Sequence, residues 1–404
     1  MRKKIFLSVL TMCAAAALAV SGCGGSGSDT GDRLAGAADE SADAAGEVPG
    51  LKDADASDAD TDAAGADVQD SSAYDPNTTE ISGEIPDTVT KTVTITATGD
   101  CTLGVAQTQS YDGSFDAYYD SYGEDYFFED VRSIFEENDL TIVNLECVLS
   151  EATERVEKTF NLKGAPEYAG ILTGSSVEVC SMGNNHTYDY GEEGFQETKQ
   201  VLSDAGITYA YSGQEGMFVT EDGVKVGIVS ANLLSQSQEK LDTMEEEIQS
   251  LRDEGADLVI ACCHWGIEKD YYPNEYQQTT AHSLIDAGAD LIIGNHPHVL
   301  QGVEIYEGKV ICYSLGNFCF GGNKNPSDKN TVIFQQTFMI TDGEVETDEP
   351  DVSIIPCKLS SASSYNDYQP TVATGDTKQN IIDLVNEYSE ALGGVSFDGE
   401  GSLS

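Results

Sequence analysis

Two segments of this chain repeat one pattern, and that pattern limits the folds open to the chain more than any other feature. In each segment a predicted helix ends at a glycine, a short apolar strand follows, and a histidine comes just after the strand. The first segment, 254–266, contains His264, and the second, 287–298, contains His296 and His298. Helices that alternate with apolar strands are typical of βαβ units, whose strands pair in parallel. We therefore expect an α/β fold in which ligands gather at the carboxyl ends of the strands.

Polar residues also follow the other strands that the sequence predicts. Gly99 and Asp100 are expected to end the first strand, and later alternating or apolar runs lead to Glu146 and to Asn185-His186. Because loops are polar, any one of these residues would follow a strand by chance. Five segments that all place such residues at strand ends predict one site at a shared edge.

The residue types at these strand ends suit a metal site. The chain has five histidines, and two of them, His296 and His298, stand one residue apart. Imidazole is a common metal ligand, and its mixture with carboxylate and amide oxygens suits Mn, Fe or Zn. Two such ions about 4 Å apart are able to clamp a phosphate group, with His186 beside Asn185 as a general acid. The sequence has no G-x-S-x-G motif or P-loop that would indicate a competing chemistry.

The N-terminal residues predict export and membrane attachment. Residues 1–22 combine a basic start, a short apolar run and small residues, which is the pattern of a signal peptide. The apolar run is too short for a stable membrane span. The residues before Cys23 resemble the lipobox of bacterial lipoproteins, which implies lipidation of Cys23 and an extracytoplasmic protein anchored to the cell membrane. The alternative is an ordinary cleavable signal with an incidental cysteine.

Composition divides the rest of the chain. Residues 23–90 are rich in Gly, Ala, Ser, Asp and Glu, so we expect a disordered acidic tether. Residues 91–360 are expected to form the folded domain, and 361–404 a C-terminal helix and tail.

The net charge of −51 argues against a nucleic-acid partner, which would need clustered Lys and Arg. The eight cysteines after Cys23 form no CxxC pair, so we expect mainly buried, small apolar side chains and cannot assign a disulfide.

Six motifs, in order over residues 93–323, resemble those of the CapA family of capsule or poly-γ-glutamate biosynthesis proteins. They are Gly99–Gly104, Asn144–Glu146, Asn184–Gly191, His264–Gly266, Gly294–His298 and Ser314–Phe318. The resemblance implies a calcineurin-like metallophosphoesterase fold, which is a four-layer α/β/β/α sandwich with mixed sheets. It also implies a role in handling an anionic cell-envelope polymer or a lipid-linked phosphate, within a capsule synthesis or export complex.

The resemblance further implies a role for each site residue. Metal ligands would be Asp100, Glu146, Asn185, His264, His296 and His298, catalytic residues His186 and Asp189, and substrate-binding residues Asn184 and Asn317. These ligands would hold one or two divalent ions, Mn, Fe or Zn. Two positions depart from the pattern. Thr102 stands where many metallophosphoesterases have a histidine, and Val105 stands where relatives often have an arginine, so one imidazole and one anion contact are missing.

Three functions remain open at this point. The first is a surface-anchored, metal-dependent phosphoesterase-like hydrolase in the synthesis or export of the anionic polymer. The second is a non-catalytic module that binds the polymer or an export complex and has a vestigial or structural metal site. The third, which has less support, is a peptidase that cuts γ-glutamyl bonds. Thr102 favours the second function, whereas His186, His296 and His298 favour the first.

Overall fold

The computed structural model describes residues 89–404, which lie within one compact unit, Ile81–Ser404. The predicted signal peptide, the lipidation site at Cys23 and the predicted tether up to residue 88 lie outside the described residues. No helix in the described part of the chain has the length and apolar character needed to cross a membrane.

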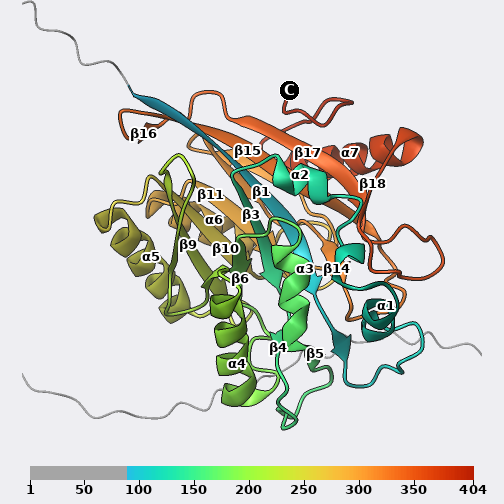
Figure 1. The fold of residues 1–404 in the computed structure, drawn as a ribbon. Helices are drawn as coiled ribbons and strands as arrows, with labels where there is room; N and C mark the ends of the chain where they lie inside the picture. Colours follow the sequence, from blue (N-terminus) through green and yellow to red (C-terminus); the bar gives the residue numbers. More distant parts are fainter. Residues whose placement is uncertain (1–88) are drawn as a thin grey trace, which may run out of the picture. The chain divides into compact units, whose positions relative to one another are not determined.

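The first sheet has nine strands and is built around β1 (Figure 1). β1 pairs in parallel with β3 and in antiparallel with β15, so the sheet is mixed. Its order is β18 (Thr371–Val372), β17 (Asp351–Lys358), β15 (Asn330–Thr341), β1 (Thr90–Thr102), β3 (Leu140–Leu145), β6 (Val179–Ser181) and β7 (Thr208–Ala210), with β14 (Asn317–Phe320) beside β1 and β16 (Glu344–Val345) beside β15.

The second sheet has six strands, and the two repeated segments form its centre. Their strands, β10 and β11, pair in parallel as predicted, with Cys262 opposite Ile293. The order is β12 (Val303–Tyr306), β13 (Lys309–Cys312), β11 (Leu291–Asn295), β10 (Leu258–His264), β9 (Lys225–Asn232) and β8 (Gly216–Val219). A third, small sheet contains β2 (Val105–Ala106), β5 (Leu162–Gly164) and β4 (Val148–Leu149).

Three apolar clusters show that the two large sheets and their helices form four layers. Ile95 of the first sheet and Ile260 of the second belong to one cluster between the sheets. The outer face of the first sheet packs against α1 (Phe115–Tyr122), α2 (Arg132–Glu136), α3 (Ala169–Thr173) and α4 (Gly191–Asp204). The outer face of the second packs against α5 (Gln238–Asp253) and α6 (Glu275–Asp286). This is the expected α/β/β/α sandwich.

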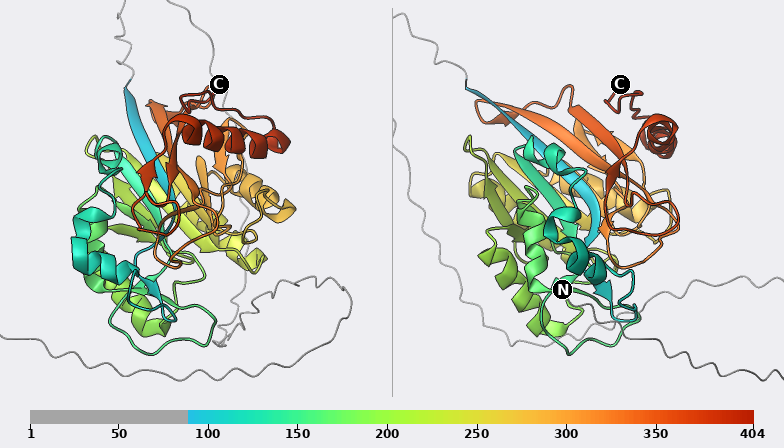
Figure 2. Two further views of the ribbon diagram at one scale, coloured as in Figure 1. Left: turned by 90° about the vertical axis from the view of Figure 1, so that its right-hand side faces the viewer. Right: turned by 45° about the vertical axis from the view of Figure 1, so that its right-hand side comes forward.

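The C-terminal helix closes one end of the sandwich. α7 (Gly375–Ser389) contacts β17 of the first sheet and β12 of the second, and Figure 2 shows it lying across the strands. Its side chains Ile381, Ile382 and Val385 join the core between the sheets. Short 3-10 helices occur at η1 (Glu124–Tyr126), η2 (Pro166–Tyr168) and η3 (Glu390–Leu392).

Two local predictions differ from the structure. Gly99 and Asp100 do not end the first strand; β1 continues to Thr102, with a register shift between Ala97 and Asp100 that bends the strand at the site. Residues 110–126 are rich in Tyr, Asp and Gly, a composition that predicts an irregular loop, but they contain α1 and η1. Ser114 caps α1 by accepting a hydrogen bond from the Ala117 amide. Tertiary packing of the aromatic side chains outweighs the loop-like composition of this segment.

The eight cysteines in the described residues are buried and free. Burial raises the pKa of Cys101 to about 12, so its thiol stays protonated and unreactive at neutral pH. This agrees with the interpretation of the cysteines as small apolar residues of the core.

Candidate metal centre

Strand ends from both sheets bring the predicted site residues together. β1 places Asp100 opposite Asn144 of β3 and opposite Asn317 of β14. In the second sheet, His264 at the end of β10 lies opposite Asn295 at the end of β11. The Asp100 amide donates to the Gly316 carbonyl at 2.9 Å. A Cβ atom at Gly99 would lie 1.9 Å from that same carbonyl oxygen, so only glycine permits this approach.

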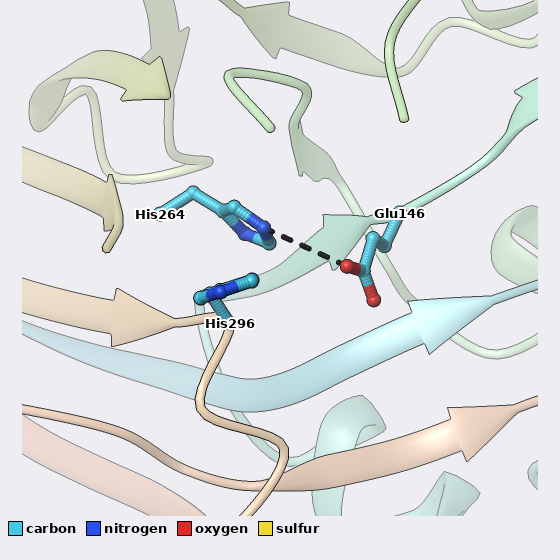
Figure 3. A group of neighbouring side chains, drawn as sticks. All are labelled: Glu146, His264 and His296. Carbon is cyan, nitrogen blue, oxygen red and sulfur yellow. Dashed lines mark ion pairs between the residues drawn. The ribbon is translucent and has the colours of Figure 1, made fainter. Parts of the chain in front are cut away.

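Two groups of potential metal ligands share one carboxylate. Glu146, His264 and His296 form one group, and Asp100, Glu146 and His298 form the other; within each, one ligand atom per residue lies within 4.8 Å of the others. Figure 3 shows His264 facing Glu146, with His296 beside them. Glu146 Oε1 lies 3.6 Å from His264 Nε2 and 3.9 Å from His298 Nε2. Glu146 would be available to both groups if each of them held an ion.

The hydrogen bonding of these groups indicates that they need a ligand. Both carboxylate oxygens of Glu146 and the Nδ1 atom of His296 are buried and have no hydrogen-bond partner among the described residues. Glu146 has no exposed surface. An unpaired buried polar or charged group is strongly unfavourable, and a divalent cation would supply the missing partner. The donor set therefore fits Mn, Fe or Zn.

Burial also sets the charges of the ligands. It lowers the pKa of His264 well below its usual range and that of His296 to about 3, so both imidazoles are neutral at pH 7, as ligands must be. It raises the pKa of Glu146, and the nearby Asp100 raises it further. Burial alone would lower the pKa of His298, but Glu146 and Asp100 outweigh it and raise that pKa to about 10. Without a metal ion, the proton on His298 balances part of the carboxylate charge.

The loop after β11 holds its two histidines in strained backbone conformations. His296 has φ of 96° and His298 has φ of 56°, which are uncommon for residues other than glycine. The His296 amide donates to Asp100 Oδ2 at 3.3 Å, and His298 Nδ1 lies 3.2 Å from the same oxygen. Such strain persists where the surrounding contacts fix it, and it is found often at functional sites.

Two predicted substrate-binding residues form hydrogen bonds with residues of the centre. Asn184 donates to Asn144 Oδ1 and to the Leu145 carbonyl, and its own oxygen accepts from the His186 amide. Asn317 contacts His298 twice: its Oδ1 lies 2.9 Å from the ring Nδ1, and its Nδ2 donates to the backbone carbonyl. Both side chains are buried. The substrate-binding roles of these two amides remain predictions.

Asn144 was not among the predicted site residues, although it joins the two ligand groups. Its Nδ2 donates to Asp100 Oδ1 at 2.7 Å and lies 3.3 Å from His264 Nδ1. Contacts of this kind orient metal ligands. Asn144 belongs to the same sequence motif as Glu146. This position two residues before a predicted ligand was the one feature of the sequence that could have indicated a role for Asn144 in the site.

His186 forms a separate group at the edge of the centre. Its Nδ1 atom lies 2.7 Å from Asp189 Oδ2, while its Nε2 atom lies 3.9 Å from Glu146 Oε1. Burial lowers the pKa of His186, and Asp189 partly opposes this shift. The carboxylate fixes the proton on Nδ1 and so leaves Nε2 directed toward the ligand cluster.

Lys158 joins this group, although no motif in the sequence indicated it. Its ammonium lies 2.5 Å from Asp189 Oδ1, donates to the Asn185 carbonyl at 2.8 Å, and lies 3.2 Å from His186 Nδ1. The residue comes from the irregular segment between β4 and β5, which carries no recognisable motif. Only the folded chain brings this lysine to the site.

Comparison with known proteins identifies the family. A family model described as bacterial capsule synthesis protein PGA_cap matches residues 94–322, which is more than half of the chain. The chain belongs to this family. The family is metallophosphoesterase-like, in agreement with the mixed α/β fold seen here.

Individual relatives agree with this membership. The chain is 30% identical over 223 residues to the capsule biosynthesis protein CapA of Bacillus anthracis, a match covering 49% of this chain and 54% of the relative. It is 32% identical over 222 residues to the PGA biosynthesis protein CapA of Bacillus subtilis (strain 168), covering 49% and 57%. The chain thus spans about half the length of the curated relatives it matches. A solved structure of a hypothetical protein from Thermus thermophilus matches with 15% identity and a TM-score of 0.41, covering 65% of this chain and 99% of that one.

The remaining predicted positions lie at the same edge. Asn185 Oδ1 is 3.0 Å from His264 Nε2, so this amide oxygen points toward the first ligand group. Thr102 is buried, and its hydroxyl donates to the Glu146 carbonyl at 3.2 Å. The group around Asp100 and His298 therefore has no second imidazole, as the sequence indicated. The ligand and catalytic roles of all these residues remain predictions.

Proposed function

We propose that this chain is a cell-surface lipoprotein that takes part in the synthesis or export of an anionic capsule polymer as a metal-dependent, phosphoesterase-like hydrolase. The observation that carries the proposal is Glu146, a fully buried carboxylate with two unpartnered oxygens, shared by two groups of ligands. Membership of the capsule synthesis family supports the biological setting.

Each side chain has a distinct task in this proposal. Asp100, Glu146, Asn185, His264, His296 and His298 hold one or two ions of Mn, Fe or Zn. When bound there, such an ion would supply Lewis-acid chemistry toward a phosphoryl or carbonyl oxygen of the substrate. Asp189 holds the Nδ1 proton of His186, which leaves the lone pair of Nε2 free to take the proton released by the attacking water and to pass it to the leaving oxygen. Lys158 holds Asp189 in place.

The proposed setting is extracytoplasmic. Cys23 carries the lipid anchor in the cell membrane, residues 23–90 form a tether, and the substrate is an anionic cell-envelope polymer or a lipid-linked phosphate. A capsule synthesis or export complex is the proposed partner. The family and the names of the relatives support this setting, because both refer to capsule or PGA biosynthesis.

One observation favours a second function, a non-catalytic binding module with a structural or vestigial metal site. Thr102 stands at the position of a histidine ligand, and its hydroxyl is used in a hydrogen bond to the Glu146 backbone. The ligand group around Asp100 therefore has fewer imidazoles than the group around His264 and His296. A protein that only binds polymer would tolerate such a loss more readily than an enzyme that needs two ions.

A single variant separates the two functions. If the chain is a hydrolase, His186→Ala should lower kcat on phosphomonoesters or phosphodiesters by about 10²–10⁴-fold, with the metal content unchanged. His282→Ala is the matched control, because His282 lies on α6 and pairs with Glu304 outside the centre. Polymer binding that survives in His186→Ala, together with no hydrolysis by the wild-type chain, would favour the binding module. Hydrolysis of γ-glutamyl bonds but not of phosphate esters would indicate a peptidase.

A further inference from the structure

A polar cavity of about 480 Å³ is lined by none of the predicted metal ligands. Its walls come from residues 325–330, the end of β17, residues 360–363 and the start of α7. Several of its lining side chains are uncharged hydrogen-bonding groups, namely Asn325, Ser327, Ser361, Ser363 and Thr377. A cavity with this lining suits a polar, hydrated ligand group.

The cavity contains positive charge in a part of the chain that has little of it. Residues 89–404 carry 15 Lys and Arg against 54 Asp and Glu. Lys329 and Lys358 both line the cavity, against one acid, Asp328. An anion that is repelled by most of this surface would therefore meet a locally favourable potential here.

The two lysines have different tasks. Lys329 donates to the carbonyls of Ala362, Ser363 and Tyr365, so its ammonium fixes the cavity wall. Lys358 is half-buried and has one hydrogen-bond partner among the described residues, Asn330 Oδ1 at 2.5 Å. An ammonium group has three donors. Lys358 therefore has donors left for a ligand.

The start of α7 adds to this potential. Thr377 lies in the first turn of the helix and lines the cavity, and the N-cap residue Thr374 makes no side-chain capping bond. The first amides of a helix have no partner within it, and its N-terminus carries partial positive charge. Asp376 in the same turn offsets part of this positive charge, so the helix end contributes less than Lys358 to the stabilisation of a carboxylate or phosphate.

Contacts along the sheet connect the cavity to the metal centre. Asn330 begins β15, and the Thr331 hydroxyl donates to the Leu315 carbonyl, two residues before Asn317, which contacts His298. On the other side, Tyr271 follows the His264 segment and its hydroxyl donates to Asp328 Oδ2 at 3.1 Å. The cavity thus lies at the same edge of the fold as the ligands. A polymer is long enough to occupy both places, whereas a small anion occupies only one.

We propose that this cavity is a second binding subsite, which takes a carboxylate group of an anionic polymer through Lys358 while a neighbouring part of the same molecule lies at the metal centre. The choice of polymer rests on the proposed function; the anion-binding character of the cavity rests on its own residues. The subsite would also reduce the electrostatic repulsion between an anionic polymer and this acidic protein, because Lys358 offers a cationic contact.

Binding of an oligomer of γ-linked glutamate to the metal-loaded full-length chain, measured by isothermal titration calorimetry, tests this proposal. Lys358→Met should weaken the binding of the oligomer about tenfold, in line with the loss of one charge-assisted contact. Ser363→Asp should weaken it similarly, because it adds a negative charge at an exposed wall position whose side chain makes no hydrogen bond among the described residues. Lys240→Met, on α5, is the matched control and should bind as the wild-type chain does. Thermal unfolding and metal content check that each variant is folded.

Three results would overturn the proposal. One is unchanged affinity in both cavity variants, and another is an equal loss in the Lys240 control. The third is binding of free glutamate or inorganic phosphate with the affinity of the oligomer and the same dependence on Lys358, because the cavity would then be a site for small anions. The proposal that the chain is a hydrolase is tested separately. An absence of hydrolysis, together with oligomer binding that depends on Lys358, would refute the proposed enzymatic activity and would still support the proposed subsite.

Discussion

The metal centre and the Lys358 cavity differ in how their polar groups are satisfied. In the centre, Glu146 and His296 are buried and have atoms without partners. In the cavity, Lys329 makes three hydrogen bonds and Lys358 keeps one bond and open access to solvent. The first site is incomplete without a ligand, whereas the second is stable without one. Ligand removal should therefore affect folding strongly at the centre and little at the cavity.

The largest expected effect comes from Glu146→Gln. This change removes the carboxylate shared by both ligand groups, so metal binding should be lost and any hydrolysis with it. Chelation should lower the Tm of the wild-type chain by roughly 10 °C, since a tightly bound ion stabilises only the folded state. In the chelated state the variant should be the more stable of the two, because it lacks a buried carboxylate whose charge His298 balances only in part. The measurement is thermal unfolding of both chains with and without a chelator.

The control for that comparison is Glu221→Gln, which alters an exposed acid before β9. It should respond to the chelator as the wild-type chain does. If Glu146→Gln keeps its metal, or if it is less stable than the wild-type chain in the chelated state, the account of the unpaired carboxylate is wrong.

An intermediate effect is expected from Lys158→Met. The ammonium holds Asp189, which in turn holds His186, so its loss should lower kcat about 10- to 100-fold without changing KM or the metal content. Steady-state kinetics and elemental analysis of the variant check this expectation, and Lys158→Arg should restore part of kcat. A rise in KM alone would contradict a positioning role and would indicate a direct contact with the substrate.

The smallest effect concerns Glu247, a buried acid on α5 away from both sites. Burial raises its pKa to about 7, the Gly213 amide opposes this, and Glu215 adds to it. The carboxyl group loses its proton at lower pH in the unfolded chain than in the folded one, so its contribution to stability is present at low pH and is lost as pH rises toward and through 7. Glu247→Gln should remove this dependence and raise the Tm at pH 8 by about 2–4 °C.

The adjacent exposed Glu246 provides the matched control, and Glu246→Gln should leave the pH dependence of Tm as it is in the wild-type chain. Thermal unfolding from pH 5 to pH 8 at constant ionic strength gives the comparison. Parallel curves for Glu247→Gln and the wild-type chain would contradict the assignment.

The sequence predicted those parts of the centre that follow strands. Apolar runs ending in His264 and in His296-Pro297-His298 indicate both the strands and their polar ends, because side chains at the carboxyl edge of a parallel sheet converge. The alternation of helices and strands predicted an α/β fold, whereas the four-layer arrangement was implied by the resemblance to the family. Local sequence was a poorer guide where tertiary packing decides, as in α1, where a Tyr- and Asp-rich segment is helical.

Neither Lys158 nor the Lys358 cavity was predicted from the sequence. Lys158 reaches Asp189 across 31 positions of the chain from a segment without regular structure, and the cavity combines β15, β17 and α7. Such contacts depend on loop paths that no local pattern encodes. The contacts of Asn184 and Asn317 were not predicted for a related reason: a motif indicates that a residue is near the site but not which of its neighbours its side chain contacts.

Metal content tests the central claim most directly. The purified chain, loaded with manganese, iron or zinc and then freed of excess metal, should contain about two transition-metal ions per molecule by elemental analysis, if Glu146 bridges them. A His296→Ala/His298→Ala double variant, which removes one ligand from each group, should lose them. A wild-type chain that retains no metal under any of these conditions would contradict the account. The absence of hydrogen-bond partners for the Glu146 carboxylate would then need an explanation other than metal binding.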